Sequence, residues 1–250
     1  PRVLLNTAVA GVVGLLLALG LIFLLEYLDD TLKSAEDLSQ ALGLTVLGTV
    51  GRIRGKNYPD KLIANQNPFS PTSEAFRMIR SRIQFAAVDR LAKTIMVSSP
   101  APQEGKSTVV ANLGVAMAQA GLKTVIVDAD LRWPVQHQIF GVSSQGGLTD
   151  LLCSPELEIK SHLKNTSVQN LQLITCGAIP PNPSELLGSK RMGQLLASLK
   201  ELADVVICDS SPVAAVADAA ILATQVDGVI LVSQAGQTRR DVAKQAVLYL

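Results

Sequence analysis

The sequence predicts an α/β fold: a mostly parallel sheet with helices on both faces, preceded by one transmembrane helix. From residue 93 onward, short β-branched runs alternate with helical patterns, and this alternation is typical of a parallel sheet that is covered on both faces. A long uncharged run opens the chain. The length of 250 residues fits one or two domains.

The composition excludes several classes of protein. Lysine and arginine number 22 against 21 acidic residues, so the net charge is +1 and nothing predicts a nucleic-acid partner. Charged residues make up 17% and hydrophobic residues 48%, the opposite of a disordered chain. Three cysteines are too few for a disulfide scaffold, and we expect Cys153, Cys176 and Cys208 to be buried thiols.

The first predicted element is a membrane helix. Residues 3–25 carry no charge, and at about 1.5 Å per residue such a run covers the roughly 30 Å of bilayer hydrocarbon. A buried core helix is the alternative, but core helices seldom remain uncharged on every face over this length. We therefore assign residues 1–27 to the end of a membrane anchor.

A juxtamembrane region, residues 28–69, follows the predicted anchor. Ser34 begins a helix and Gly43 ends it. Residues 45–50 predict a short strand, and residues 51–69 are polar and irregular, which is typical of a linker or mobile loop. Ser70 and Pro71 then begin a helix that is expected to run through residue 87 and to open the main domain, residues 70–250.

Five strands and three further helices are predicted in the main domain. Each strand is a short apolar run, and most of the strands are separated by a helical pattern. The predicted strands are residues 93–98, 123–128, 171–176, 204–209 and 228–233, and the predicted helices are 105–120, 189–202 and 213–224. Ligands of such sheets bind beyond the carboxyl ends of the strands.

A phosphate-binding loop follows the first of these strands. The segment matches GxxxxGK[ST], except that Pro100 stands at the first glycine, and it lies between a strand and a helix as such loops do. Backbone N–H groups of the loop can cradle phosphates, Lys106 can reach the β- and γ-phosphates, and the Ser107 hydroxyl can ligate magnesium. The predicted nucleotide-binding residues are Ala101, Pro102, Gln103, Glu104, Gly105, Lys106, Ser107 and Thr108.

Acidic residues end two other strands. Asp128 and Asp130 stand two apart, so both side chains can point toward the phosphate site if the strand geometry persists through them. Asp209 follows another apolar run, as does the aspartate of a Walker B strand that holds the magnesium shell. Together with the preceding loop, these residues predict a P-loop NTPase that binds ATP and Mg²⁺.

At this point the sequence resembles the bacterial tyrosine kinases (BY-kinases) of capsule and exopolysaccharide biosynthesis. Those kinases carry Ala-Pro-x-x-Gly-Lys-Ser/Thr, so the missing first glycine is no defect within that family. They also carry Asp-x-Asp-x-Arg, Asp-x-x-Pro and Glu-x-x-Arg-x-x-Arg. The matching residues are Ala101 to Ser107; Asp128, Asp130 and Arg132; Asp209 and Pro212; and Glu74, Arg77 and Arg80.

The resemblance implies an activity and a role for each motif. It implies an ATP-dependent protein-tyrosine autokinase that phosphorylates tyrosines in the C-terminal tail of a neighbouring subunit and regulates polysaccharide polymerisation and export. Asp128 would activate the tyrosine hydroxyl, and Lys106 would stabilise the charge on the transferred group. Ser107, Asp130 and Asp209 would organise magnesium, and Lys106, Asp128 and Asp130 form the expected catalytic set.

The resemblance also implies an assembly and a location. The helix with Glu74, Arg77 and Arg80 would mediate a ring-shaped homo-oligomer, whereas the residues alone favour a solvated helix face. The kinase domain would lie in the cytoplasm at the bacterial inner membrane, beside the polysaccharide export machinery and behind the second membrane helix of a chain-length-determinant protein. Tyr27, Tyr58 and Tyr249 form no tyrosine cluster, so we expect a truncated C-terminus.

Two other classes of function compete with the kinase. A partitioning or positioning ATPase of the deviant Walker group carries a signature lysine five residues before the P-loop lysine, and Ala101 occupies that position. A polysaccharide co-polymerase whose nucleotide fold serves mainly for assembly is the other alternative. The three phosphate-site motifs favour the kinase.

Overall fold

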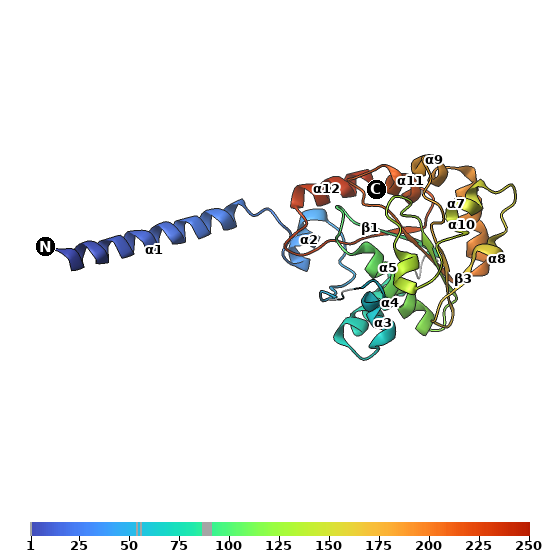
Figure 1. The fold of residues 1–250 in the computed structure, drawn as a ribbon, viewed down its shortest axis with the longest axis horizontal. Helices are drawn as coiled ribbons and strands as arrows, with labels where there is room; N and C mark the ends of the chain where they lie inside the picture. Colours follow the sequence, from blue (N-terminus) through green and yellow to red (C-terminus); the bar gives the residue numbers. More distant parts are fainter. Residues whose placement is uncertain (1, 54, 56, 87–91) are drawn as a thin grey trace.

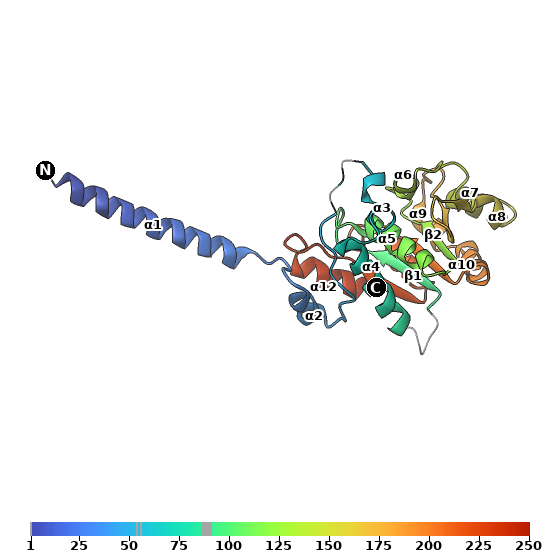
Figure 2. The ribbon, with the colours of Figure 1, turned by 90° about the horizontal axis from the view of Figure 1, so that it is seen from below.

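The computed structural model describes residues 2–53, 55, 57–86 and 92–250. Its first element is the long helix α1 (Val3–Leu28), which projects away from the rest of the chain (Figures 1 and 2). The stretch Asn6–Leu28 has a mean hydropathy of 2.8, and none of it is buried against the other described residues. The helix is therefore long enough and apolar enough to cross a bilayer.

A six-stranded sheet forms the centre of the main domain. Its strands are β1 (Thr94–Ser98), β2 (Thr124–Asp128), β3 (Lys164–Asn165), β4 (Leu171–Ile174), β5 (Val205–Asp209) and β6 (Gly228–Leu231). They lie in the order β3-β4-β2-β5-β1-β6, and every pairing is parallel except that of β3 with β4. The five predicted strands are thus confirmed, and β3 is a short addition at one edge.

Helices cover both faces of this sheet, as predicted. The first face carries α3 (Ile63–Gln66), α4 (Pro71–Ala86), α5 (Lys106–Gln119) and α6 (Gln136–Phe140). The second carries α7 (Leu148–Cys153), α9 (Pro183–Leu187), α10 (Lys190–Leu202) and α11 (Asp218–Ala223). The remaining helical elements are α2 (Ala35–Leu42), η1 (Pro59–Lys61), α8 (Ile159–His162) and α12 (Arg240–Tyr249), which packs beside α2 (Figure 1).

Successive side chains of each central strand point alternately into two apolar cores. In β5, Val206 and Cys208 pack into the core under α10, whereas Ile207 packs into the core under α5. In β2, Val127 packs into the core under α10 and Ile126 into the core under α5. Strand side chains point alternately to the two faces, so near-continuous apolar runs are required where helices cover both.

The predicted strand over residues 45–50 is wrong. The segment pairs with no strand in the described chain and packs along α4 instead. Arg82 Nη1 donates to the carbonyls of Val46 (3.4 Å) and Leu47 (3.0 Å). At Gly48, a Cβ atom would lie 2.7 Å from Ile79 Cγ1, so the close approach of this backbone to α4 requires glycine. The β propensity of the segment is overridden by packing against a helix.

The predicted linker over residues 51–69 is wrong in part, because it contains η1 and α3. Asn112 of α5 holds this region in place: its Oδ1 accepts the Ala64 N–H at 2.8 Å, and its Nδ2 donates to the Lys61 carbonyl at 2.8 Å. Leu62 and Ala64 are buried beneath. The helix expected to end at residue 87 is α4, and residue 87 itself lies outside the described residues. Cys176 and Cys208 are buried as predicted, whereas Cys153 is exposed.

Candidate active site

Three neighbouring strands bring the predicted site residues to one edge of the sheet. In the order β2-β5-β1, β1 leads into the P-loop, β2 ends at Asp128 and β5 ends at Asp209. Asp128 and Asp209 are register partners. Because parallel strands place their carboxyl ends at the same edge, segments that are separated by up to about a hundred residues in the chain converge there.

The P-loop backbone has an unusual conformation, which the Glu104 side chain of the loop stabilises. Gln103 (φ 66°) and Gly105 (φ 90°) both lie in the left-handed region. Glu104 closes the loop, since its Oε2 accepts the Ala101 N–H at 3.0 Å, and its Oε1 accepts the Thr238 hydroxyl at 2.5 Å. Burial raises the pKa of Glu104 against the effect of these hydrogen bonds. Pro102, Gln103 and Gly105 are exposed, so the loop presents its backbone to solvent as a phosphate cradle must.

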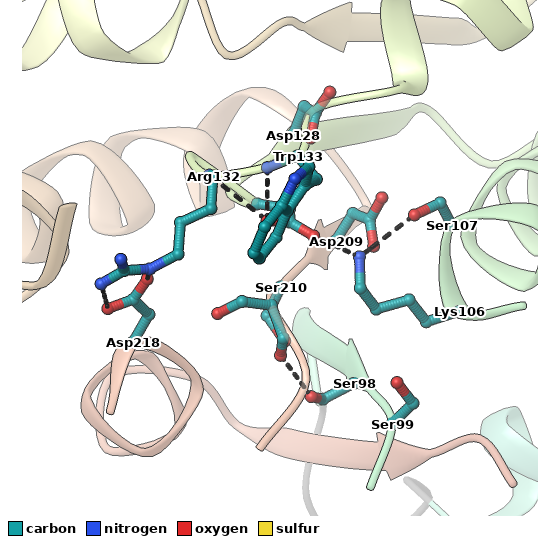
Figure 3. A network of polar contacts seen from close by, with 12 residues as sticks. Ser98, Ser99, Lys106, Ser107, Asp128, Arg132, Trp133, Asp209, Ser210 and Asp218 are labelled. Carbon is teal, nitrogen blue, oxygen red and sulfur yellow. Dashed lines mark hydrogen bonds and ion pairs between the residues drawn. The ribbon is translucent and has the colours of Figure 1, made fainter. Parts of the chain in front are cut away.

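Lys106 begins α5 and points back into a cluster of oxygens (Figure 3). Its Nζ lies 2.6 Å from Asp130 Oδ2, 3.3 Å from Asp209 Oδ1 and 3.2 Å from Ser107 Oγ. Burial acts to lower the pKa of Lys106, but the Asp209 and Asp130 carboxylates outweigh it and hold this pKa above its usual value. The predicted residues Ser107, Asp130 and Asp209 therefore meet at the Lys106 ammonium.

Asp128 joins this cluster through Gln136, a residue that the sequence analysis missed. The Gln136 N–H donates to Asp128 Oδ2 at 3.0 Å, and its Nε2 donates to Asp209 Oδ2 at 2.8 Å and to the Ser107 carbonyl at 3.0 Å. Asp128 Oδ1 is buried and has no hydrogen-bond partner among the described residues. Burial and then the Asp209 carboxylate raise the pKa of Asp128 well above its usual value.

The donor set of this cluster fits a magnesium ion. Mg²⁺ prefers hard oxygen ligands and usually takes one or two protein carboxylates together with phosphate and water. Asp130, Asp209 and the Ser107 hydroxyl supply such oxygens, and they already surround a cation, the Lys106 ammonium. Within the described residues, no three carboxylate, imidazole or thiol groups form a complete cage, so the cluster suits an ion that is shared with phosphates.

An ion pair fixes the turn that carries Asp130. Arg132 Nε and Nη2 donate to the two Asp218 oxygens at 2.7 and 3.2 Å (Figure 3). Ser184 Oγ also donates to Asp218 Oδ1. Burial acts to raise the pKa of Asp218, but the hydrogen bonds from Arg132 and Ser184 outweigh it and leave this pKa below its usual value. The sequence motif pointed to Arg132, whereas Asp218 lies in a segment without any such signal.

The helix predicted to mediate assembly, α4, packs against α5. Arg77 Nη1 pairs with Glu74 Oε2 at 2.7 Å and its Nη2 donates to the Pro68 carbonyl at 2.7 Å. Arg80 Nη1 donates to the Ala116 carbonyl of α5 at 3.0 Å. These three residues form a charged stripe on α4. The stripe consists of the exposed Glu74 carboxylate, the partly exposed Arg77, and Arg80, which also links α4 to α5.

Comparison with known proteins agrees with this geometry. Residues 95–231 match the CobQ/CobB/MinD/ParA nucleotide binding domain family. The chain is 42% identical over 193 residues to the tyrosine-protein kinase YwqD of Bacillus subtilis, covering 77% of this chain and 81% of that protein. It is 30% identical to the tyrosine-protein kinase etk of Escherichia coli, covering 97% of this chain but only 36% of that longer protein.

Solved structures give the same result. The crystal structure of the chimerical protein CapA2B2 superimposes with a TM-score of 0.80 at 38% identity, covering 86% of this chain and 92% of that one. The match extends well beyond the P-loop, to most of the chain, at an identity that carries more than fold alone. The chain therefore belongs to the bacterial tyrosine-protein kinases, the enzymes of capsule and exopolysaccharide synthesis whose catalytic domain is a CobQ/CobB/MinD/ParA-type nucleotide-binding domain.

Proposed function

We propose that this chain transfers the γ-phosphoryl group of ATP to tyrosine hydroxyls in the C-terminal tail of a neighbouring subunit. The observation that carries the proposal is the contact of Lys106 Nζ with both Asp130 and Asp209, beside the buried pair Asp128 and Gln136. A P-loop lysine, two metal-binding carboxylates and a further carboxylate are the parts that phosphoryl transfer to a hydroxyl requires.

Each residue has a distinct task in this mechanism. The backbone of residues 101–108 binds the phosphates, helped by the amino terminus of α5. Lys106 neutralises charge on the transferred group. The unpartnered Oδ1 of Asp128 accepts the proton of the tyrosine hydroxyl, while Gln136 keeps its other oxygen occupied and so orients the carboxylate. Ser107, Asp130 and Asp209 would hold Mg²⁺, which would supply charge neutralisation at the phosphates.

The assembly and location follow the same proposal. α1 anchors the chain in the bacterial inner membrane, with the kinase domain on the cytoplasmic side where ATP is available. Glu74, Arg77 and Arg80 contribute to the contact between subunits of a ring-shaped homo-oligomer, in which one subunit offers its tail to the next. The enzyme would thereby regulate the polysaccharide polymerisation and export machinery.

A transfer assay tests the proposal. Detergent-solubilised protein is mixed with Mg²⁺, ATP labelled at the γ-phosphate and a separate tyrosine-rich peptide, and the labelled amino acids are then identified. We expect label on tyrosine, its loss in Lys106→Met, and a fall of about 100-fold or more in Asp128→Asn, the range for removal of a general base. The exposed Glu156→Gln variant is the matched control and should keep the wild-type rate.

Other outcomes would contradict the proposal. Free phosphate without phosphotyrosine would favour a switch ATPase, although Ala101 stands where that group carries its lysine. Nucleotide binding with neither product would favour an assembly module. Phosphotyrosine that persists in Lys106→Met would remove Lys106 from its assigned task.

A further inference from the structure

Trp133 is an exposed indole on the turn that carries the site aspartates. Its exposed fraction is 65%, whereas the residues on either side of the same turn, Asp130 and Gln136, are buried. It is also the sole tryptophan of the chain. The proposed mechanism does not use this side chain, and a large aromatic surface left in water beside a charged cluster is a candidate for a binding role.

The backbone beneath the indole is held firmly. Asp130 Oδ1 accepts the Trp133 N–H at 3.1 Å and the Arg132 N–H at 3.4 Å. Arg132 is in turn paired with the buried Asp218, and Pro134 restricts the backbone of the residue before it. The exposure of Trp133 thus belongs to a fixed turn, so an aromatic ligand that stacks there loses little of its binding energy to ordering the protein.

The indole lies at the end of the nucleotide site where transfer occurs. Asp130, three residues earlier, is 2.6 Å from Lys106 Nζ, and that ammonium is the group that reaches the terminal phosphate in a P-loop. In the view of Figure 3, the indole lies between the Arg132–Asp218 pair and Lys106 with Asp209. A nucleotide base would lie at the other end of the phosphate chain, so the base is a poor match for this position.

A second exposed apolar side chain stands on the neighbouring loop. Ile179 is 64% exposed and follows β4, the sheet neighbour of β2. Its loop leads into α9, where Ser184 donates to the same Asp218 that pairs with Arg132. The buried Asp218 carboxylate thus links the two loops, and each loop carries one exposed apolar side chain, Trp133 or Ile179.

We propose that Trp133 is the docking platform for the aromatic ring of the acceptor tyrosine. The inference rests on the proposed tyrosine-kinase function and names the part of the site that selects the acceptor. The ring stacks on the indole, and its hydroxyl then reaches the Asp128 side of the Lys106 cluster. An aliphatic hydroxyl on serine or threonine has no ring to stack and would gain nothing from Trp133, which gives the site a preference for tyrosine.

Intrinsic fluorescence tests binding without requiring catalysis. Because Trp133 is the sole tryptophan, its emission, excited where tyrosine does not absorb, reports on this one position. The detergent-solubilised chain with Mg²⁺ and a non-hydrolysable ATP analogue is titrated with the peptides (Gly-Ser-Tyr)₃, (Gly-Ser-Phe)₃ and (Gly-Ser-Ala)₃. We expect the first two to change the emission saturably and the alanine peptide to leave it unchanged. A response to the nucleotide that no peptide alters, or no response to any peptide, overturns the proposal.

Kinetics supply the second measurement. Trp133→Ala should raise the KM for (Gly-Ser-Tyr)₃ by about three- to tenfold, the range for one aromatic pair, while kcat and the KM for ATP stay within about twofold. Trp133→Phe keeps a ring and should restore most of the affinity. Phe69→Ala removes another exposed aromatic ring, 95% exposed and outside the site, and should match the wild type.

The kinetic outcomes separate the two proposals. An unchanged peptide KM in Trp133→Ala, with phosphotyrosine still formed, overturns the docking role and leaves the kinase function intact. A fall in kcat at unchanged KM also overturns it, because a merely structural role for Trp133 would act in that way. If even the wild-type chain forms no phosphotyrosine on this peptide, the kinase function itself fails, while the fluorescence titration still decides whether the ring binds.

Discussion

The hydroxyl of Thr238 donates to Oε1 of Glu104, and the other oxygen of the same carboxylate accepts the Ala101 N–H at 3.0 Å. One side chain thus links the P-loop to the segment between β6 and α12. Thr238 is itself buried, and its carbonyl accepts the N–H of Leu32 at 2.9 Å. Four residues after α1 ends, the chain is therefore attached to the segment that supports the nucleotide loop.

Removal of the Thr238 hydroxyl should weaken nucleotide binding. Thr238→Val keeps the shape but leaves Oε1 of Glu104 without its donor, and a hydrogen bond to a charged group contributes about 1.5–3 kcal/mol. If about half of that is transmitted to the loop, the Kd for a non-hydrolysable ATP analogue rises about 4- to 13-fold, measured by titration calorimetry. Thr224→Val, at the exposed end of α11, is the matched control. An unchanged Kd would mean that the loop conformation does not depend on Thr238.

The Arg132–Asp218 pair should control the rate of transfer more than nucleotide affinity. Asp218→Asn removes the charge that holds Arg132, so the turn with Asp130 loses its fixed position, and displacement of a reacting group by about 1 Å can cost up to 100-fold in rate. We expect kcat for tyrosine phosphorylation to fall about 10- to 100-fold, with the Kd for nucleotide changed far less. Ser184→Ala, which removes only one donor to Asp218, should lower kcat by about threefold.

A double-mutant cycle supplies the control for that prediction. If Asp218 acts through Arg132, the variant Arg132→Ala with Asp218→Asn should be no slower than Arg132→Ala alone. Losses that simply multiply would show that the two residues act independently. A change in the far-ultraviolet circular dichroism of either variant would point to unfolding rather than to a displaced turn.

The parts of the site with local signals were predictable from the sequence, and the parts set by tertiary register were not. Lys106 and Asp209 follow apolar strands within short motifs, so their convergence follows from strand order at a parallel sheet edge. Gln136 is a single amide in an unremarkable run, and its role exists only because Asp128 and Asp209 are register partners that need a donor between them. Asp218 likewise belongs to no motif, and its role arises only because the fold places it against Arg132.

The fold shows the same division. The five main strands were predictable because each is apolar on both faces, which is the requirement of a buried parallel strand. The segment 45–50 has the same β-branched character, but it pairs with no strand in the described chain, and the missing Cβ of Gly48 lets its backbone lie against Ile79. An apolar segment joins a sheet or packs on a helix according to its neighbours in the tertiary structure. A local sequence pattern does not specify those neighbours.

Asp227 should make stability depend on pH. Its Oδ2 accepts the N–H groups of Lys93 and Thr94 and the Thr94 hydroxyl at 2.9–3.0 Å, and its Oδ1 accepts Lys200 Nζ at 2.7 Å. Burial acts to raise the pKa of Asp227, but these hydrogen bonds outweigh it and leave the pKa below its usual value. A carboxyl group whose pKa is lower in the folded than in the unfolded state stabilises the fold above the unfolded pKa, and that stabilisation is lost as pH falls through the folded pKa.

The variant Asp227→Asn tests this pH dependence of stability. At neutral pH, we expect it to lower the free energy of unfolding by about 1 kcal/mol, which corresponds to about 2–4 °C in Tm for a domain of this size. The difference from wild type should shrink as pH falls below about 5, because the carboxylate is protonated first in the unfolded state and, once the pH is below the folded pKa, in both states. Exposed Glu156→Gln should show no such difference. A gap that stays constant between neutral and acid pH would contradict the ionic origin.

The two arginines on α4 should separate assembly from stability. Arg77 makes its contacts with Glu74 and the Pro68 carbonyl near the surface, so Arg77→Ala should shift the particle to a smaller mass in multi-angle light scattering with Tm nearly unchanged. Arg80 also donates to the Ala116 carbonyl of α5, so Arg80→Ala should reduce both the mass and the Tm, the latter by about 2–4 °C. Arg82→Ala alters the same helix outside the stripe and should keep the wild-type mass. If Arg77→Ala also keeps that mass, the stripe is a solvated helix face, and Arg80 serves only to join α4 to α5.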